Sequence, residues 1–315
     1  MAMRRLGTSD LVFEPIVFGG NVFGWTADEA TSFALIDRFV ERGFAMIDTA
    51  DVYSIWVPGH RGGESETIIG KWLERGGARN RILIATKCGM DMGKGGKGLS
   101  RKHILASVDA SLKRLRTDYI DLYQAHADDA SVPLEETLEA FASLIAAGKV
   151  RAIGASNYTA PRLAEALAVS KAQGLARYVS LQPHYNLANR TQFEGALQDL
   201  CVAEGIGVIP YYSLAGGFLS GKYRKSEDLV GRARARTAGQ YLNERGLNLL
   251  AEIDRVAAAH KATPAQIALA WLLAQPGITA PIVSATSLDQ LDEILASTKI
   301  ALGAEALTRL DKASA

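Results

Sequence analysis

Eight short apolar segments alternate with helical patterns along the chain, and this alternation limits the possible folds more than any other feature. Amphipathic stretches separate the segments, with helix signals such as Ser100 as an N-cap and Gly43 as a stop. Buried strands that alternate with helices indicate a parallel sheet covered by helices. The predicted strands are residues 16–20, 44–48, 81–87, 119–126, 150–154, 178–182, 206–212 and 281–283.

The number of these units predicts a closed (β/α)8 TIM barrel, an α/β fold. An open, doubly wound sheet is the alternative, but no G-x-G-x-x-G motif follows the first strand. Residues 3–15 predict an N-terminal β-hairpin with its turn at residues 7–10. A long connection rich in glycine and arginine, residues 214–241, follows the seventh strand. Composition does not change along the chain, so we expect one domain over residues 1–315.

Charge and composition argue against several classes of partner. The chain has 35 basic and 34 acidic residues, a formal net charge of +1, which predicts neither nucleic acid nor an anionic membrane as partner. No apolar run is long enough to span a bilayer and the N-terminus has no signal-peptide pattern, so a cytoplasmic location is expected. Cys88 and Cys201 lie too far apart for a metal-binding spacing, so no metal is predicted. Oligomeric state is not predicted.

Four side chains with potential for proton transfer fall where the predicted strands end. Asp48, Lys87 and His126 end strands two, three and four, and Tyr53 follows in the loop after Asp48. We expect Lys87 to lower the pKa of Tyr53, Asp48 to pair with Lys87, and His126 to polarise a carbonyl oxygen. Separately, each has an ordinary structural interpretation, as an ion pair or a packing residue. Their joint placement favours a site, and hydride transfer to a carbonyl would require a nicotinamide cofactor.

Several motifs in a fixed order strengthen this interpretation. With them, the chain resembles the aldo-keto reductase family along nearly its whole length. The motifs lie at residues 48–53, 85–87, 118–126, 148–157, 181–186 and 211–223.

The resemblance implies a barrel with a tetrad of Asp48, Tyr53, Lys87 and His126, in which Tyr53 is the general acid. It also implies that a nicotinamide carboxamide is bound at the ends of strands five and six and that an aromatic ring from strand seven stacks on the nicotinamide. The cofactor-binding residues predicted in this way are Gly20, Asn21, Asp48, Ser156, Asn157, Gln182, Tyr211, Ser213, Leu214, Lys222, Ser284, Thr286, Ser287, Gln290 and Glu293.

The chain departs from many family members where the adenosine end of the cofactor is expected. Ser284 and Gln290 occupy positions where members that favour NADPH often have Lys and Arg. Arginines of the long connection, or Lys222, offer compensation for the missing charge. NADP(H) is therefore favoured, with NAD(H) possible. Tyr212 stands where the family usually has Ser, which predicts an altered pyrophosphate or substrate side.

The predicted activity is NAD(P)H-dependent reduction of aldehydes or ketones, or the reverse oxidation of an alcohol or sugar. Trp25, Trp56 and Phe218 are predicted to line an apolar substrate pocket, together with Tyr53 and His126. Two alternatives stay open: a cofactor-binding regulatory or sensor subunit with little turnover, and a Schiff-base enzyme that uses Lys87 as nucleophile. In each enzymatic case the expected partner is a small molecule.

Overall fold

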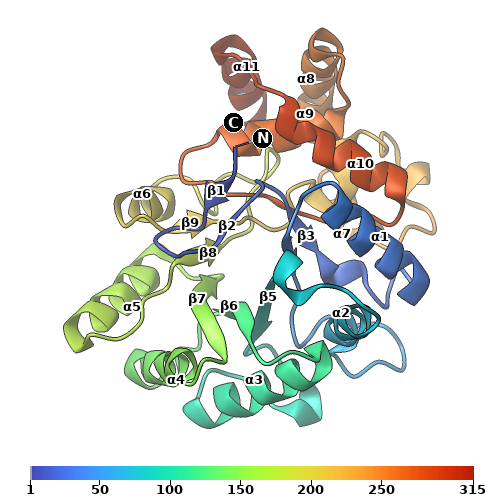
Figure 1. The fold of residues 1–315 in the computed structure, drawn as a ribbon. Helices are drawn as coiled ribbons and strands as arrows, with labels where there is room; N and C mark the ends of the chain where they lie inside the picture. Colours follow the sequence, from blue (N-terminus) through green and yellow to red (C-terminus); the bar gives the residue numbers. More distant parts are fainter. Residues whose placement is uncertain (1) are drawn as a thin grey trace.

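The eight predicted strands form a parallel sheet that curls into a barrel, with helices around its outside (Figure 1). This computed structural model describes residues 2–315. The strand order is β10-β3-β4-β5-β6-β7-β8-β9, and each strand overlaps one predicted segment, so the predicted fold is confirmed. The strands are β3 (Val17–Gly19), β4 (Met46–Asp48), β5 (Leu83–Cys88), β6 (Ile120–Ala125), β7 (Val150–Ser156), β8 (Ser180–Gln182), β9 (Gly207–Val208) and β10 (Ile282–Val283).

Backbone hydrogen bonds close the sheet between its first and last members. The Thr279 N–H donates to the Val208 carbonyl at 2.8 Å, and the Ile282 N–H donates to the Pro210 carbonyl at 2.9 Å. On its other side, Ile282 pairs with Val17 of β3. Because the strands are parallel and the sheet is closed, all eight carboxyl ends meet at one rim.

The opposite end of the barrel is filled by the predicted N-terminal hairpin, β1 (Arg4–Arg5) and β2 (Val12–Phe13). Its apolar side chains join a core cluster inside the barrel with residues from the strands, such as Met46 and Leu122. Gly7 at the hairpin turn has a φ of 55°, and a Cβ there would lie 2.1 Å from the Val179 carbonyl oxygen. The hairpin therefore packs directly on the amino ends of the strands, and only the carboxyl rim is left for a site.

Most predicted helices are present, with caps that follow from the sequence. The Ser100 hydroxyl accepts from the His103 N–H, and Thr263 forms a capping box with Gln266. The helices around the barrel are α1 (Glu29–Glu41), α2 (Glu64–Glu74), α3 (Arg101–Leu115), α4 (Leu134–Ala146), α5 (Ala160–Gln173), α6 (Ala196–Ala203), α8 (Glu244–His260), α9 (Pro264–Ala274) and α10 (Leu288–Ala296).

Three details differ from the sequence prediction. The sequence pattern predicts a helix over residues 192–204, but α6 starts at Ala196, because Gly195 has a φ of 85° directly before it. The long connection after β9 holds a short helix, α7 (Ala235–Gly239), preceded by the 3-10 segment η4 (Ala215–Ser220). A final helix, α11 (Ala304–Ser314), was not predicted and packs against α8.

Candidate active site

The four residues predicted as a tetrad come together at the carboxyl rim. Asp48 ends β4, Lys87 lies one residue before the end of β5, and His126 directly follows β6. These three strands are neighbours in the sheet. Tyr53 lies in the loop between β4 and α2 and is partly exposed. Adjacent parallel strands thus bring together residues that are far apart in the sequence.

The Lys87 ammonium lies at the centre of this group. Its Nζ donates to Asp48 Oδ2 at 2.6 Å, to the Thr49 carbonyl oxygen at 2.8 Å and to Tyr53 Oη at 2.8 Å. An ammonium has three N–H donors, so all of them are used. The predicted ion pair between Asp48 and Lys87 is present, and the two side chains are only 1% and 0% exposed.

Asp48 is held from its other side by two glutamines. Its Oδ1 accepts from Gln182 Nε2 at 2.9 Å and from Gln124 Nε2 at 3.2 Å. Gln124 was not predicted as part of the site, although it is a polar residue inside a buried strand and lies in register beside Lys87. Gln182, predicted to bind the nicotinamide carboxamide, contributes its amide nitrogen to the carboxylate network.

The pKa shifts at this site favour a neutral phenol. Burial raises the pKa of Tyr53 well above 10, and the carboxylate of Asp48 adds to the increase. Burial lowers the pKa of Lys87, which the pairing with Asp48 opposes. The pKa of Tyr53 is therefore not lowered overall, because burial, together with Asp48, outweighs the ammonium of Lys87 that lies 2.8 Å from the phenol. Tyr53 keeps its proton, which a general acid requires.

His126 presents a neutral imidazole beside the phenol. Burial lowers its pKa well below 6.5, and the nearby charge of Lys87 contributes. Its ring centroid lies 6.0 Å from that of Tyr53. The buried Nδ1 atom has no hydrogen-bond partner among residues 2–315. A buried polar atom without a partner is costly, and at a site of this kind it indicates a position for a polar ligand atom.

Ser156 and Asn157, at the end of β7, supply neutral polar groups next to His126. The Ser156 hydroxyl donates to the Gln182 carbonyl at 3.0 Å, and the Asn157 amide donates to the His126 carbonyl at 2.9 Å. Asn157 has a φ of 58°, in the left-handed region that non-glycine residues rarely adopt. Its exposed side chain is thus positioned by local backbone strain at the rim.

Tyr211 and its neighbours form an aromatic cluster after β9. The Tyr211 ring stacks on His184 with centroids 5.3 Å apart, and its hydroxyl donates to Asn157 Oδ1 at 2.8 Å. Tyr212 is 39% exposed and has a φ of 53°. A positive φ at a bulky residue is a true outlier. His184 also lies within hydrogen-bond distance of Asn189, so this ring is held on two sides.

The other predicted cofactor residues form two groups. Around the end of β3, Ser284 Oγ donates to the Gly19 carbonyl and lies 2.7 Å from Asn21 Oδ1. Gly20 directly follows the last residue of β3, and the Ser287 hydroxyl caps α10 by accepting from the Gln290 N–H. In the second group, Ser213 is buried, Leu214 is partly buried and Lys222 is exposed. The first group also includes Thr286, whose N–H donates to Gln290 Oε1, and Glu293 further along α10.

The side chains of Trp25, Trp56 and Tyr53 form an aromatic wall at the proposed site. The centroids of Trp25 and Trp56 are 5.6 Å apart, and those of Trp56 and Tyr53 are 6.0 Å apart, all edge to face. Trp56 is 45% exposed. Phe218, the third residue predicted for this pocket, is fully buried and packs against Tyr241. The prediction for Phe218 is wrong, because the 3-10 segment η4 turns its ring into the core.

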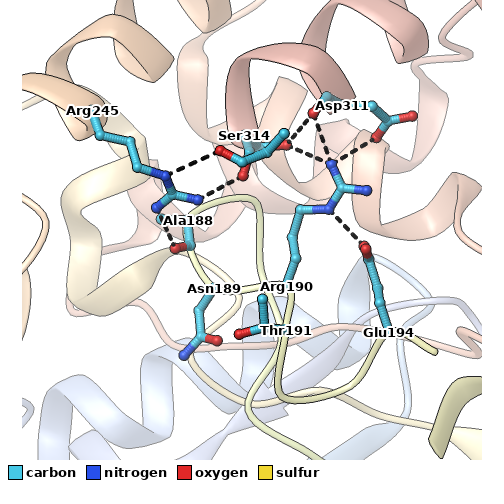
Figure 2. Close-up of a pocket in the computed structure, with 9 residues that line it drawn as sticks. Ala188, Asn189, Arg190, Thr191, Glu194, Arg245, Asp311 and Ser314 are labelled. Carbon is cyan, nitrogen blue, oxygen red and sulfur yellow. Dashed lines mark hydrogen bonds and ion pairs between the residues drawn. The ribbon is translucent and has the colours of Figure 1, made fainter. Parts of the chain in front are cut away.

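A separate cavity lies between α11 and the segment after β8 (Figure 2). Its volume is about 520 Å³. The arginines that line it are occupied: Arg245 donates to the carbonyl of Ser314, and Arg190 forms an ion pair with Glu194 (Figure 2). These contacts fasten the C-terminal helix, so we interpret the cavity as structural.

Comparison with known proteins agrees with this geometry. The model of the Aldo/keto reductase family matches residues 15–315. The chain belongs to the aldo/keto reductase family. Like the members named as reductases, it is an NAD(P)-dependent oxidoreductase. Within residues 2–315, no helix combines the length and the apolar character needed to cross a membrane.

Curated relatives cover almost the entire chain. It is 35% identical to the uncharacterized oxidoreductase YrpG of Bacillus subtilis, across 99% of this chain and 95% of that protein. It is 32% identical to protein tas of Escherichia coli, across 99% and 97% of the two chains. It is also 30% identical to versiconal hemiacetal acetate reductase of Aspergillus parasiticus, across 99% and 96%. These similarities extend over the barrel and its loops alike.

Proposed function

We propose that this oxidoreductase reduces aldehydes or ketones, with Tyr53 as the general acid of an Asp48, Tyr53, Lys87 and His126 tetrad. The observation that carries the proposal is the position of Lys87 Nζ, 2.6 Å from Asp48 and 2.8 Å from Tyr53. Lys87 donates to Tyr53 Oη, and the phenol itself makes only a long contact of 3.4 Å as donor to Asp48 Oδ2. Its proton can therefore turn toward a substrate oxygen.

Each tetrad residue has a distinct role in this proposal. A bound reduced nicotinamide supplies the hydride that attacks the carbonyl carbon. Tyr53 gives its proton to the carbonyl oxygen, and the Lys87 N–H then stabilises the tyrosinate that remains. Asp48 keeps Lys87 charged in its buried position. The neutral imidazole of His126 orients and polarises the carbonyl oxygen.

For the cofactor, we propose a site along the rim from β7 to β10. The neutral groups of Ser156 and Asn157 suit an uncharged carboxamide, and Tyr211 supplies an aromatic face. Exposed Lys222 suits a phosphate. We favour NADP(H), with exposed Lys222 or arginines of the connection after β9 to pair with its phosphates. NAD(H) is also possible, because the segment from residues 284 to 293 holds three carboxylates and no lysine or arginine to pair with a 2′-phosphate.

For the substrate, we propose a small carbonyl compound, or the corresponding alcohol in the reverse direction, held between Trp25 and Trp56 with its oxygen at Tyr53 and His126. A Schiff base on Lys87 is less consistent with this site, since the ammonium donates all three protons and retains no free lone pair.

The test is Tyr53→Phe, combined with titration of NADPH and NADH. Loss of the acid should lower kcat by about 10²- to 10⁴-fold, while NADPH affinity, measured by fluorescence, stays the same. Retained activity on 4-nitrobenzaldehyde would refute the role of Tyr53. Tight cofactor binding by the unmodified protein without turnover of any carbonyl would instead support a regulatory or sensor subunit.

A further inference from the structure

One arginine beside the proposed site has no counterion. Arg234 lies in the connection after β9, directly before α7. Its Nη2 atom is buried and has no hydrogen-bond partner in the described part of the chain, residues 2–315. Burying a cationic group without a partner is strongly unfavourable. An unpaired guanidinium in such a position therefore calls for an explanation.

Other partly buried arginines of the protein show the usual arrangement. Arg79 and Arg114, with side chains 18% and 25% exposed, each contact a buried carboxylate, at 2.6 and 2.7 Å. Arg162, 20% exposed, contacts Asp128 at 2.9 Å. Each of these three arginines meets an acid of this chain, and partly buried Arg4 donates to backbone carbonyl oxygens instead. The contrast indicates that the partner of Arg234 comes from outside the chain.

The surroundings of Arg234 point toward the reacting groups. Its guanidinium carbon lies 5.6 Å from the centre of the Trp25 ring, and Trp25, Trp56 and Tyr53 form the continuous wall described above. The hydroxyls of Tyr212 and Tyr53 lie close enough to affect the pKa of Arg234, which burial lowers. Arg234 therefore lies at one end of the aromatic wall that has the proposed general acid at its other end.

The backbone around Arg234 is fixed by close packing. Gly216 has a φ of 68°, and a Cβ there would lie 2.9 Å from Thr237 Cγ2. The 3-10 segment η4 therefore presses directly against α7, and Arg234 at the start of α7 has little freedom to move. Preorganisation of this kind lowers the entropy cost of ligand binding.

We propose that Arg234 binds a carboxylate on the carbonyl substrate, so that the enzyme prefers aldehydes or ketones that carry an anionic group. The inference rests on the proposed reductase function. A guanidinium forms paired hydrogen bonds with a carboxylate and can stack on an aromatic ring at the same time. Trp25 would support its face while the unpaired N–H groups meet the carboxylate.

The experiment compares two aldehydes of similar shape, 4-formylbenzoate and its methyl ester. Wild-type enzyme should show a higher kcat/KM for the acid. In Arg234→Met, the ratio of kcat/KM for acid over ester should fall by about 10- to 100-fold, mainly through KM, because a charge-assisted pair is lost. Arg234→Lys should retain part of the preference, since it keeps the charge and loses the planar fork.

Arg236→Met is the matched control, because Arg236 is an exposed arginine two positions further along. It removes the same charge and should leave the acid-to-ester ratio unchanged. NADPH affinity is measured for every variant. A loss of NADPH affinity in Arg234→Met, with equal effects on both aldehydes, would assign the arginine to a cofactor phosphate and overturn the proposal. An unchanged ratio in that variant would overturn it as well.

Binding of benzoate, followed by tryptophan fluorescence with NADP⁺ present, separates this inference from the reductase proposal. If benzoate binds to the wild type and not to Arg234→Met, the anion site stands even where neither aldehyde is reduced, and only the reductase proposal fails. If benzoate does not bind to the wild type, the anion site is refuted whatever the turnover.

Discussion

Asp51 is a buried carboxylate whose charge should make the protein less stable as the pH rises. It lies in the loop between β4 and α2 and is 3% exposed. Its Oδ1 atom lacks a hydrogen-bond partner among the residues described, 2–315. Burial raises the pKa of Asp51 from 3.8 to about 7, and the neighbouring carboxylate of Glu66 adds to the increase, while Arg114 and Lys87 oppose it.

The sign of the effect follows from proton linkage. Between pH 3.8 and about 7 the folded protein keeps the Asp51 proton that the unfolded chain has lost, so the free energy of unfolding falls as the pH rises. A shift from 3.8 to about 7 corresponds to about 4 kcal/mol. This is an upper limit at pH 8, because the folded protein can relax around the charge.

Asp51→Asn keeps the shape of the neutral acid and removes the titration. At pH 8 it should raise the free energy of unfolding, by up to about 4 kcal/mol, with a gain that shrinks toward zero near pH 4. Urea denaturation from pH 5 to pH 8 measures this difference. Parallel pH dependences for the variant and the wild type, or a less stable variant at pH 8, would refute the reasoning.

Asp121→Asn is the matched control, since Asp121 is equally buried but fully paired. Its carboxylate contacts Arg79 and Arg151, both at 2.6 Å, and accepts from the Ile84 N–H. Removing this charge should lower the free energy of unfolding by about 3 kcal/mol or more, because two arginines lose their partner. At pH 8 we therefore expect the free energy of unfolding to rise in Asp51→Asn and to fall in Asp121→Asn.

Two further predictions concern packing. Gly70→Ala should destabilise the protein by about 3 kcal/mol, because a Cβ at Gly70 would lie 2.0 Å from the Arg114 carbonyl oxygen where α2 meets α3. The control in the same denaturation assay is Gly303→Ala, since a Cβ at Gly303 would meet open space. Trp56→Ala should raise KM for aromatic aldehydes by about 3- to 10-fold through loss of the edge-to-face wall; unchanged kinetics for every accepted carbonyl would remove Trp56 from the pocket.

The sequence predicted the barrel and the meeting of the tetrad for the same physical reason. Apolar runs marked the strands, and a closed parallel sheet places every strand end on one rim. Asp48 and Lys87, 39 residues apart, could therefore be expected to touch. Helix α11 was not predicted, although its apolar residues, Leu307 and Leu310 among them, follow a helical spacing.

Other features depended on balances that a sequence does not display. Whether Tyr53 gains or loses acidity depends on how completely Asp48 offsets Lys87 and on how deeply both are buried. The turn of Gln182 toward Asp48 depends on Gln124 lying beside it. Phe218 reads equally well as a pocket or core residue, and only the course of the 3-10 segment decides between them.

Two of the unpaired buried polar groups lie beside the proposed general acid. Its buried carboxylates Asp121 and Glu66 are matched with arginines, as expected where stability governs. Arg234 and the Nδ1 atom of His126 lack partners within residues 2–315, and both lie beside Tyr53. Each lowers the stability of the ligand-free protein, and a ligand that supplies the missing partner recovers that free energy on binding. These two groups therefore point to the same site as the motifs do, and they predict a ligand with an acceptor for the guanidinium as well as a carbonyl oxygen for the phenol.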